Sequence, residues 1–436
     1  MRSIRNGSSL PGSSASRPTS PGPAHRACSV YSSPPTFDVR RQSCLIIGAG
    51  QCGARAALAL RAHDPSRHIL LIGEESALPY ERPPLSKAVL CGTAEPNAGE
   101  LYREEELREA RINLALDVRV AAVNLDESRV QLVDGRSYLF DDLILATGAS
   151  ARTLDVLTPG MPGVHYLRDK GDAARLRGAL LPGAEILVVG GGFLGLEIAA
   201  SASQCGCRVT VVECGRQLLG RAASLLAAQQ LQDKHAERGV SIHLRCQLRR
   251  AESRKSGKWR VELSDGTALC PHAIVVAIGS VANDQLARAA GLICNDGVAV
   301  NASGRSSHPH VFAAGDVACR VTRWRDSPMR FESWDNAEES AKVVSAAVAG
   351  TPPPLEPVPY FWTDQYDVTY QLLGLPTEAP QQRVERNADG SVRTIQHLND
   401  EGQLQFAELI NAARERRALT RLIEQAYTHT AHRNAS

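Results

Sequence analysis

The chain has 436 residues, of which 43% are apolar and 22% are charged, and its formal net charge at pH 7 is +2. This length predicts two or three domains with ample interior for a large hydrophobic core. No apolar run approaches the ~18 residues that a membrane-spanning helix needs. Residues 1–40 hold five Arg and one Asp, which leaves about −2 for the rest of the chain. We therefore expect no membrane and no nucleic-acid partner.

The 11 cysteines are odd in number and scattered along the chain. Several lie in apolar contexts, as Cys44 and Cys270 do, and Cys205 and Cys207 are spaced as CxC rather than as CxxC. No spacing matches the ligand set of a zinc site or an iron–sulfur cluster. We expect reduced thiols that serve mainly as small core residues, in a cytoplasmic protein without a metal site.

The first 40 residues are rich in Ser, Pro, Gly and Arg and show no hydrophobic periodicity. Such a segment cannot bury enough apolar surface to offset the entropy that it loses on ordering. Its Arg and Ser content resembles that of a transit peptide, but its prolines and glycines argue against an amphipathic helix. We predict a disordered tail over residues 1–40.

The next stretch predicts a strand, a glycine turn, a helix, a second strand and an acid. An apolar run at 43–47 leads into GAGQCG at 48–53, and a helix-forming segment covers 54–61. A second apolar run at 68–72 precedes Glu74. This order is typical of a unit that binds a dinucleotide.

Each glycine of this turn has an expected role. A dinucleotide pyrophosphate must approach backbone N–H groups at a helix N-terminus, and a Cβ on the turn would hold it off. Gly48 is expected to form the tight turn, Gly50 to admit the phosphates, and Gly53 to let the helix pack on the strand. Glu74 is the candidate acceptor for the ribose hydroxyls.

A proline-rich loop, PYERPPLSK, follows at 79–87. Its prolines stiffen the chain where it leaves the sheet, at the edge that would face a nucleotide. Two interpretations stay open: a rigid surface connection, or a loop that places Arg82 and Lys87 over a ligand.

The remainder of the first unit predicts a helix over 101–111 and a hairpin over 116–140 that turns at Asp134-Gly135. A buried strand over 142–148 then ends in glycine, and a linker rich in Pro and Gly passes through 159–163. The opening unit is complete at this linker.

The opening pattern then returns. An apolar run at 186–189 leads into GGGFLG at 190–195, a helix over 196–204 and a strand over 208–213 that ends in Glu213. Two such fingerprints in one chain are far more specific than one.

Glu213 bears on the choice of nucleotide. A carboxylate at this place accepts from the ribose of NADH and repels the 2′-phosphate of NADPH, so we expect a preference for NADH. Arg216 and Arg221 lie close enough in sequence to weaken that preference.

The second unit continues with a helix near 222–238 and a β-meander over 240–263 that turns at Asp265-Gly266. A strand over 273–279 then echoes the strand that ends at Gly148.

An apolar strand that ends in Gly315-Asp316 indicates a return to the first unit. Asp335 and Asn336 are expected to cap a helix from Ala337 to Ala349, whose positive end would face an electron-rich ligand. The last unit ends in an amphipathic helix. The apolar face of that helix is expected to carry Leu419, Leu422, Ile423 and Ala426.

Two nucleotide sites in one chain indicate that one nucleotide is held while the other visits. A flavin dinucleotide paired with a nicotinamide dinucleotide fits this arrangement. Asp316 would then bind ribityl oxygens, and the capped helix would stabilise negative charge on the reduced ring.

Six motifs in combination resemble one enzyme family. They are PYERPPLSK at 79–87, ATG at 146–148, GGGFLGLEIAASA at 190–202, AAGDVA at 313–318, ESWDNAEESA at 332–341 and YFWTDQYD at 360–367. They resemble the FAD-dependent ferredoxin reductases of bacterial aromatic-ring-hydroxylating dioxygenase systems. Within this family, the stretch around the second glycine motif is most similar to the reductase components of 3-phenylpropionate/cinnamate dioxygenases. The resemblance covers about residues 43–425.

The resemblance implies a glutathione-reductase-like α/β fold, with two Rossmann-type dinucleotide-binding domains plus a C-terminal α+β domain. The FAD-binding domain would be discontinuous, comprising 41–153 and 271–350. The NAD-binding domain would comprise 154–270, and the C-terminal reductase domain 351–436.

The resemblance also implies cofactor contacts, residue by residue. The expected contacts of FAD are Gly48, Gly50, Gly53, Glu74, Arg82, Lys87, Thr147, Gly148 and Asp316. The expected contacts of NADH are Gly190, Gly192, Gly195, Glu213 and Gly279. Trp334 and Trp362 are expected near the edges of the isoalloxazine, although each could instead be a core residue. Lys87 and Glu197 are the expected catalytic pair, in which Glu197 pairs with Lys87 beside the flavin and helps to position the nicotinamide.

The expected reaction follows from electron counting. NADH delivers two electrons as a hydride, a [2Fe-2S] ferredoxin accepts one at a time, and a flavin converts between the two. The resemblance implies an NADH:ferredoxin oxidoreductase for aromatic hydrocarbon catabolism, whose ferredoxin, a separate protein, feeds an aromatic-ring-hydroxylating dioxygenase. PPLSK stands where disulfide reductases of this fold carry a Cys pair, and Cys91 follows it alone. This argues against disulfide-reductase and peroxidase chemistry.

Two alternative functions stay open. One is a reductase for rubredoxin or another small carrier, and the other is a flavoprotein like apoptosis-inducing factor with a role in signalling or assembly. The oligomeric state is also open, a homodimer included. Arg323, Arg325 and Arg330 are a candidate basic patch for docking ferredoxin, although surface arginines are usually just solvated.

Overall fold

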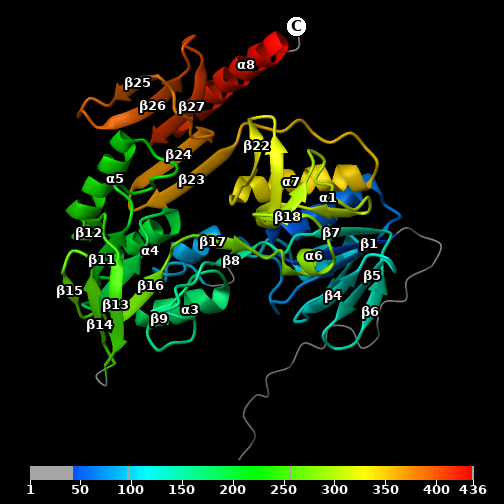
Figure 1. The fold of residues 1–436 in the computed structure, drawn as a ribbon, viewed down its shortest axis with the longest axis horizontal. Helices are drawn as coiled ribbons and strands as arrows, with labels where there is room; N and C mark the ends of the chain where they lie inside the picture. Colours follow the sequence, from blue (N-terminus) through cyan, green and yellow to red (C-terminus); the bar gives the residue numbers. More distant parts are fainter. Residues whose placement is uncertain (1–42, 96–98, 255–256, 435–436) are drawn as a thin grey trace, which may run out of the picture. The chain divides into compact units, whose positions relative to one another are not determined.

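The computed structural model describes residues 43–95, 99–254 and 257–434 (Figure 1). The predicted disordered tail over 1–40 lies outside the described residues. None of the described helices is long and apolar enough to cross a membrane.

A five-stranded parallel sheet follows the first glycine motif, in the order β20-β7-β1-β2-β3. Its last strand in sequence comes from a segment more than 160 residues beyond the others, so two distant stretches build one sheet. The strands are β1 (Ser43–Ile47), β2 (His68–Ile72), β3 (Ile112–Ala115), β7 (Asp142–Leu145) and β20 (Val311–Ala313).

Helices α1 (Gln51–His63) and α7 (Trp334–Val348) lie side by side in Figure 1 and pack together against this sheet. They share a core of fully buried apolar residues that includes Ile46, Leu60 and Phe312. A second core includes Leu45 and residues of an antiparallel sheet. That sheet comprises β4 (Val120–Asn124), β5 (Arg129–Leu132) and β6 (Ser137–Leu139).

The second unit repeats the first, with a parallel sheet in the order β12-β11-β10-β16-β9. Its strands are β9 (Val164–His165), β10 (Glu185–Val189), β11 (Arg208–Glu213), β12 (Ser241–Leu244) and β16 (Ala273–Val276). Its helices are α3 (Lys170–Ala179), α4 (Phe193–Gln204) and α5 (Leu225–Glu237). An antiparallel sheet of β13 (Leu248–Ser253), β14 (Trp259–Leu263) and β15 (Ala268–Leu269) again accompanies the parallel one.

The two units are joined by β8 (Ala149–Ala151) and β17 (Ser280–Ala282), which pair antiparallel. A four-stranded sheet precedes α7 and follows α6 (Gln285–Ala289). It consists of β18 (Cys294–Asn295), β19 (Gly297–Val300), β21 (Ala318–Thr322) and β22 (Arg325–Arg330). The remaining helical segments of these units are α2 (Glu104–Glu109) and the 3-10 turns η1 (Pro83–Ser86) and η2 (Gly315–Val317).

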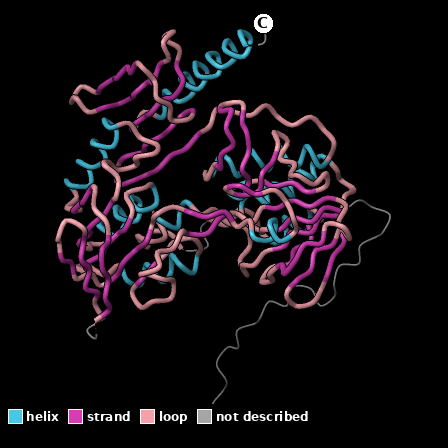
Figure 2. Tube along the Cα trace, in the orientation of Figure 1, coloured by secondary structure: helices cyan, strands magenta, loops and turns pink. Residues whose placement is uncertain are grey.

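The C-terminal segment forms a five-stranded antiparallel sheet on which α8 (Arg416–Asn434) packs (Figure 2). The order of the sheet is β23-β24-β27-β26-β25. The strands are β23 (Tyr360–Gln365), β24 (Val368–Gly374), β25 (Gln381–Arg386), β26 (Val392–Leu398) and β27 (Leu404–Ile410), and the 3-10 turn η3 (Ala413–Glu415) precedes α8.

Several predicted elements differ from those observed. The predicted hairpin over 116–140 has three strands, because a further turn at 125–128 divides it. The first strand of the predicted meander over 240–263 is β12, and it pairs with β11 in the parallel sheet rather than with the antiparallel strands that follow it. The predicted domain boundary at 271 lies too early, because β16 pairs with β10 in the second sheet.

Two details of the predicted helices were wrong. Ser333 caps α7 by accepting a hydrogen bond from Asn336 N, whereas Asp335 and Asn336 lie inside the helix. Leu422 of α8 is 47% exposed, whereas Leu419 and Ile423 are buried as expected. The buried stripe on α8 is therefore narrower than the sequence predicts.

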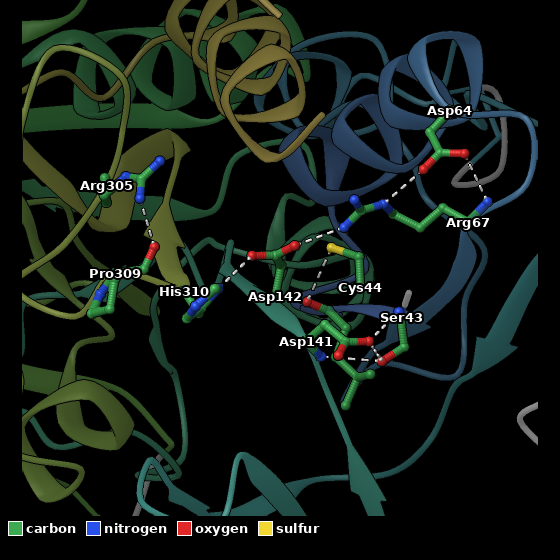
Figure 3. Close-up of polar contacts among 10 residues, drawn as sticks. Ser43, Cys44, Asp64, Arg67, Asp141, Asp142, Arg305, Pro309 and His310 are labelled. Carbon is green, nitrogen blue, oxygen red and sulfur yellow. Dashed lines mark hydrogen bonds and ion pairs between the residues drawn. The ribbon is translucent and has the colours of Figure 1, made fainter. Parts of the chain in front are cut away.

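A polar network fixes the amino ends of β1 and β7 (Figure 3). The Arg67 guanidinium lies 2.7 Å from Asp142 Oδ2 and 3.1 Å from Asp64 Oδ2. Asp142 Oδ1 also lies 3.2 Å from His310 Nδ1, and Ser43 N donates to Asp141. Burial alone would lower the pKa of Arg67, but its two carboxylate partners raise it. The network leaves the opposite, carboxyl ends of the strands free for a ligand.

Arg67 is only 5% exposed, so its loss would leave Asp142 without its main cationic partner. We expect Arg67→Met to reduce the free energy of unfolding by about 3 kcal/mol, the usual cost of breaking a buried ion pair. Urea denaturation would show a lower midpoint.

The matched control is Arg129→Met, because Arg129 and its partner Glu127 are 46% and 57% exposed. Such an exposed pair contributes less than about 1 kcal/mol. Equal midpoints for the two variants would contradict the structural role of Arg67.

Candidate functional site

The two glycine turns are built alike, and neither accepts a side chain at its first position. Gly48 and Gly190 each have φ +113°, a left-handed conformation that favours glycine. A Cβ on Gly48 would lie 2.1 Å from the carbonyl oxygen of Ala146, and one on Gly190 would lie 2.2 Å from that of Ala277. Each turn is therefore pressed against the neighbouring strand.

The third glycine of each motif serves packing, as the sequence predicts. A Cβ on Gly53 would lie 1.9 Å from Gly48 O, and one on Gly195 would lie 2.1 Å from Gly190 O. Helices α1 and α4 can approach their turns this closely only with glycine at these positions.

The second glycine of each motif faces open space. Gly50 and Gly192 are the N-caps of α1 and α4, and neither helix has a side-chain cap within the described part of the chain. A Cβ on either residue would meet no described atom within 4 Å. Uncapped N–H groups at a helix N-terminus with room in front of them fit the pyrophosphate of a dinucleotide.

One cavity of about 2460 Å³ connects the two turns. It exceeds the ~300–1,000 Å³ usual for a site that holds one small ligand. Apart from the packing residues Gly53 and Gly195, every predicted site residue lines it. These are Gly48, Gly50, Glu74, Arg82, Lys87, Thr147, Gly148, Gly190, Gly192, Glu197, Glu213, Gly279, Asp316, Trp334 and Trp362.

Lys87 and Glu197 meet in this cavity, with Lys87 Nζ 2.8 Å from Glu197 Oε1. Thr363 donates to the same oxygen at 2.7 Å, and Ser86 donates to Oε2 at 2.5 Å. The Glu197 side chain is 9% exposed. Residues from η1, α4 and β23 thus fix one carboxylate, and the loop that carries Lys87 faces the cavity.

Arg82 belongs to a second charged group on the cavity wall. Its guanidinium lies 2.7 Å from Glu75 Oε1 and also donates to the carbonyl of Arg168. Arg168 in turn lies 2.8 Å from Asp316 Oδ2. Burial would lower the pKa of Arg82, but Tyr80 and Glu75 raise it. Sequence reasoning did not find Arg168, which follows a short strand and belongs to no motif.

The two acids expected at the ribose positions are placed differently. The register pairs Ile47 with Ile72 and Val189 with Val212, so Glu213 corresponds to Gly73, and Glu74 lies one residue further on. A Cβ on Gly73 would lie 2.6 Å from the Ala49 side chain, which leaves no room there for an acid.

The Glu213 carboxylate contacts the second glycine turn, which begins at Gly190. It accepts hydrogen bonds from Gly191 N at 2.7 Å and Gly215 N at 2.6 Å. Glu74 instead forms an exposed ion pair with Arg119. Only Glu213 is held against the glycine turn.

Thr147, Gly148 and Gly279 follow the carboxyl ends of β7 and β16. Asn283 holds the first two of these residues, since its side chain donates to Thr147 O at 2.9 Å, its carbonyl accepts from Thr147 Oγ1 at 2.7 Å, and its N donates to Gly148 O at 3.0 Å. Gly148 and Gly279 both have positive φ, which lets the chain turn from the sheets into the paired strands β8 and β17.

Trp334 and Trp362 contact each other at the cavity wall. Their ring centroids are 5.8 Å apart with the planes at 73°, and Trp334 Nε1 donates to Glu81. Tyr360, which the sequence did not single out as a site residue, stacks on Trp362. The Arg416 guanidinium lies over the Tyr360 ring, 3.6 Å from its centroid. Both tryptophans are half-buried rather than core residues.

The first turn of α7 also borders the cavity. Burial, followed by the nearby Glu339 carboxylate, raises the pKa of Asp335 to about 6. Asp335 therefore stays mostly ionised at pH 7, and this turn loses negative charge only as the pH falls towards 6.

One group of described residues, His243, Cys246 and Asp265, has donor atoms of metal-ligand type within 4.8 Å of one another. His243 Nδ1 and Asp265 Oδ2 lie 3.0 Å apart, which an ordinary hydrogen bond explains.

The chain matches two protein-family models. Residues 42–341 match the pyridine nucleotide-disulphide oxidoreductase model, and residues 360–436 match the reductase C-terminal model.

Curated relatives match most of the chain. The anthranilate 1,2-dioxygenase system ferredoxin--NAD(+) reductase component of Burkholderia cepacia is 37% identical over 87% of this chain and 93% of its own length. The 3-phenylpropionate/cinnamic acid dioxygenase ferredoxin--NAD(+) reductase component of Photorhabdus laumondii is 34% identical, over 88% and 97%.

Solved structures agree with these relatives. The covalent putidaredoxin reductase–putidaredoxin complex contains a chain that is 31% identical with a TM-score of 0.84, covering 88% of this chain and 93% of that one. These similarities confirm the predicted fold class.

Gly50 and Gly192, the second glycines of the two motifs, offer a matched pair of tests, because both have backbone angles that alanine also adopts. We expect Gly50→Ala to fold but to bind FAD weakly, since the new methyl group occupies the phosphate space. Gly192→Ala should keep FAD and raise the KM for NADH.

Flavin absorbance per protein and steady-state kinetics measure the two effects. The assignment of the turns would be wrong if Gly192→Ala lost flavin, or if Gly50→Ala changed only the KM for NADH.

Proposed function

Because the chain belongs to the pyridine nucleotide-disulphide oxidoreductase family and ends in a reductase C-terminal domain, we propose that it is an NADH-dependent ferredoxin reductase that holds FAD. The observation that carries this proposal is that one cavity contains both glycine turns and has the Lys87–Glu197 pair on its wall. The turn at 48–53 is called the first cradle, and the turn at 190–195 the second cradle. Relatives named as ferredoxin reductases over most of the chain support it.

The FAD-binding domain is proposed to combine residues 41–153 with the stretch from about 280 to 350. Support comes from β20 and α7, which join the sheet and helix of the first glycine motif. The NAD-binding domain then spans 154–279, and residues 351–436 form the C-terminal domain.

The cofactor contacts are proposed from the cavity wall. FAD takes the first cradle, with Gly48, Gly50, Thr147, Gly148 and Asp316 as its contacts. The second cradle takes NADH, through Gly190, Gly192, Glu213 and Gly279. Arg82, Glu74, Trp334 and Trp362 are the other proposed contacts of FAD.

The chain's own residues position the reactants. A bound flavin supplies the conversion of one hydride into two single-electron transfers. Ser86, Thr363 and Lys87 all donate to the Glu197 carboxylate. The ion pair, with Lys87 Nζ 2.8 Å from Glu197 Oε1, in turn holds the Lys87 ammonium group at the cavity wall. The loop over 83–87 has no cysteine, so it offers no dithiol for disulfide reduction.

A [2Fe-2S] ferredoxin is the proposed acceptor, and an aromatic-ring-hydroxylating dioxygenase is the proposed destination of its electrons. The relatives' names support a ferredoxin as the acceptor and a dioxygenase as the destination, and the [2Fe-2S] cluster of the acceptor stays a prediction. A homodimer stays a prediction, which sedimentation equilibrium tests.

The predicted basic patch needs one correction. The Arg330 side chain is only 7% exposed, and it pairs with Glu332 and, at 3.2 Å, with Asp296. It therefore offers no free charge to a partner. Arg323 and Arg325 remain exposed on either side of the buried Trp324, over whose ring the Arg323 guanidinium lies.

Parallel assays test the function. With NADH as donor, the FAD-loaded protein should reduce a [2Fe-2S] ferredoxin much faster than it reduces rubredoxin. Faster rubredoxin reduction would favour the first alternative function. A flavin that NADH reduces but that neither carrier reoxidises would favour a role like that of apoptosis-inducing factor.

The nucleotide preference has its own test. We expect Glu213→Ala to lower the ratio of kcat/KM for NADH to that for NADPH at least about tenfold, because hydrogen bonds to a charged group contribute about 1.5 kcal/mol or more. Repulsion of the 2′-phosphate is lost as well.

The control is Glu237→Ala, which removes a 68%-exposed carboxylate at the end of α5. An unchanged ratio in Glu213→Ala, with flavin content intact, would remove Glu213 from this role.

A further inference from the structure

Cys91 and Cys205 lie together where the segment after η1 packs on the C-terminal end of α4. Cys91 Sγ is 3.5 Å from Gln204 Oε1 and 4.0 Å from Ser201 O, and Cys205 Sγ is 3.7 Å from Leu90 O. Each thiol thus contacts the residue that precedes the other cysteine. The two thiols also influence each other electrostatically, since Cys91 contributes to the raised pKa of Cys205. Cys91, which stands alone in sequence, has a partner in space.

We propose that Cys91 and Cys205 form a redox pair that closes to a disulfide when the protein meets hydrogen peroxide. One thiolate attacks the peroxide, becomes a sulfenic acid and releases one water. The second thiol attacks that sulfur and displaces another water. Two thiols thereby lose two electrons and two protons, and one peroxide becomes two waters.

The surroundings of the pair suit this reaction. Both thiols are partly exposed, and neither is bonded to another cysteine. Burial, with Cys91 contributing, raises the pKa of Cys205, whereas the Arg177 guanidinium opposes the rise. Arg177 packs on Gly92, where a Cβ would lie 2.7 Å from Arg177 Nη2. A cation at this place stabilises the thiolate that must form.

Cys207 is the competing thiol, and the geometry disfavours it. Its Sγ is 3.3 Å from Leu181 O, on a different segment from that which Cys205 contacts. Burial, followed by the neighbouring Cys205 thiol, raises the pKa of Cys207 to about 11, whereas Arg177 partly offsets the rise at Cys205. The pair therefore joins Cys205 to Cys91 rather than to its neighbour in sequence.

The disulfide would link two parts of the cavity wall. The same two elements already meet through Lys87 and Glu197, and Ser201 Oγ donates to Ser86 O at 2.7 Å. A covalent bond four residues beyond Lys87 would prevent this segment from separating from α4. Its predicted consequence is slower local opening of residues 83–94.

The full-length, FAD-loaded protein tests the proposal. After reduction and desalting it is treated with hydrogen peroxide, its free thiols are alkylated, and its peptides are mapped by mass spectrometry. We expect a linked peptide that contains Cys91 and Cys205, and its loss on treatment with dithiothreitol. Amide hydrogen exchange over 83–94 should slow in the oxidised protein.

Three variants complete the test. Cys205→Ser and Cys91→Ser should each abolish the linked peptide and the slower exchange, whereas Cys207→Ser should keep both. If either Cys205→Ser or Cys91→Ser fails to fold, the other variant still tests the link. A Cys205–Cys207 link, oxidation without a link, or slowed exchange in the Cys205→Ser protein would overturn the proposal.

Discussion

The architecture depends on two backbone contacts in which a glycine turn touches the neighbouring strand. The carbonyl oxygen of Ala146 occupies the place of a Gly48 Cβ, and that of Ala277 does the same for Gly190. Because each turn lies this close to its sheet, the helix that follows points its N-terminus at the sheet's carboxyl edge. Gly50 and Gly192 then leave the uncapped helix ends open to phosphate. The charged residues of the site, Lys87, Glu197 and Asp316, line the cavity that contains the N-termini of α1 and α4.

The two units are repeats, but only the first is completed by a distant segment. β20 and α7 return to it after the second unit has ended, and they bring Asp316 and Trp334 to the cavity. The C-terminal sheet adds Thr363, which reaches Glu197. One carboxylate is therefore fixed by residues of η1, α4 and β23, and its position depends on all three parts of the chain being folded.

The sequence was most informative where the chemistry is local. Glycine motifs, their strands and their helices could be predicted because a tight turn and a close approach have few alternatives to glycine. The pairing of Lys87 with Glu197, 110 residues away, came only from the family resemblance. Arg168 and the contact between Cys91 and Cys205 depend on tertiary packing, and no motif carries them. The cap of α7 was misplaced because Ser333, Asp335 and Asn336 are all good N-caps, and only the backbone decides among them.

The central claim is that one cavity brings a visiting nicotinamide nucleotide against a resident flavin. An anaerobic titration of the purified, FAD-loaded protein with NADH tests it most directly, with the visible absorbance of the flavin as the signal. The account predicts that the absorbance bleaches in proportion to added NADH and is fully lost at one equivalent per flavin. Bound flavin that keeps its absorbance in excess NADH would contradict it.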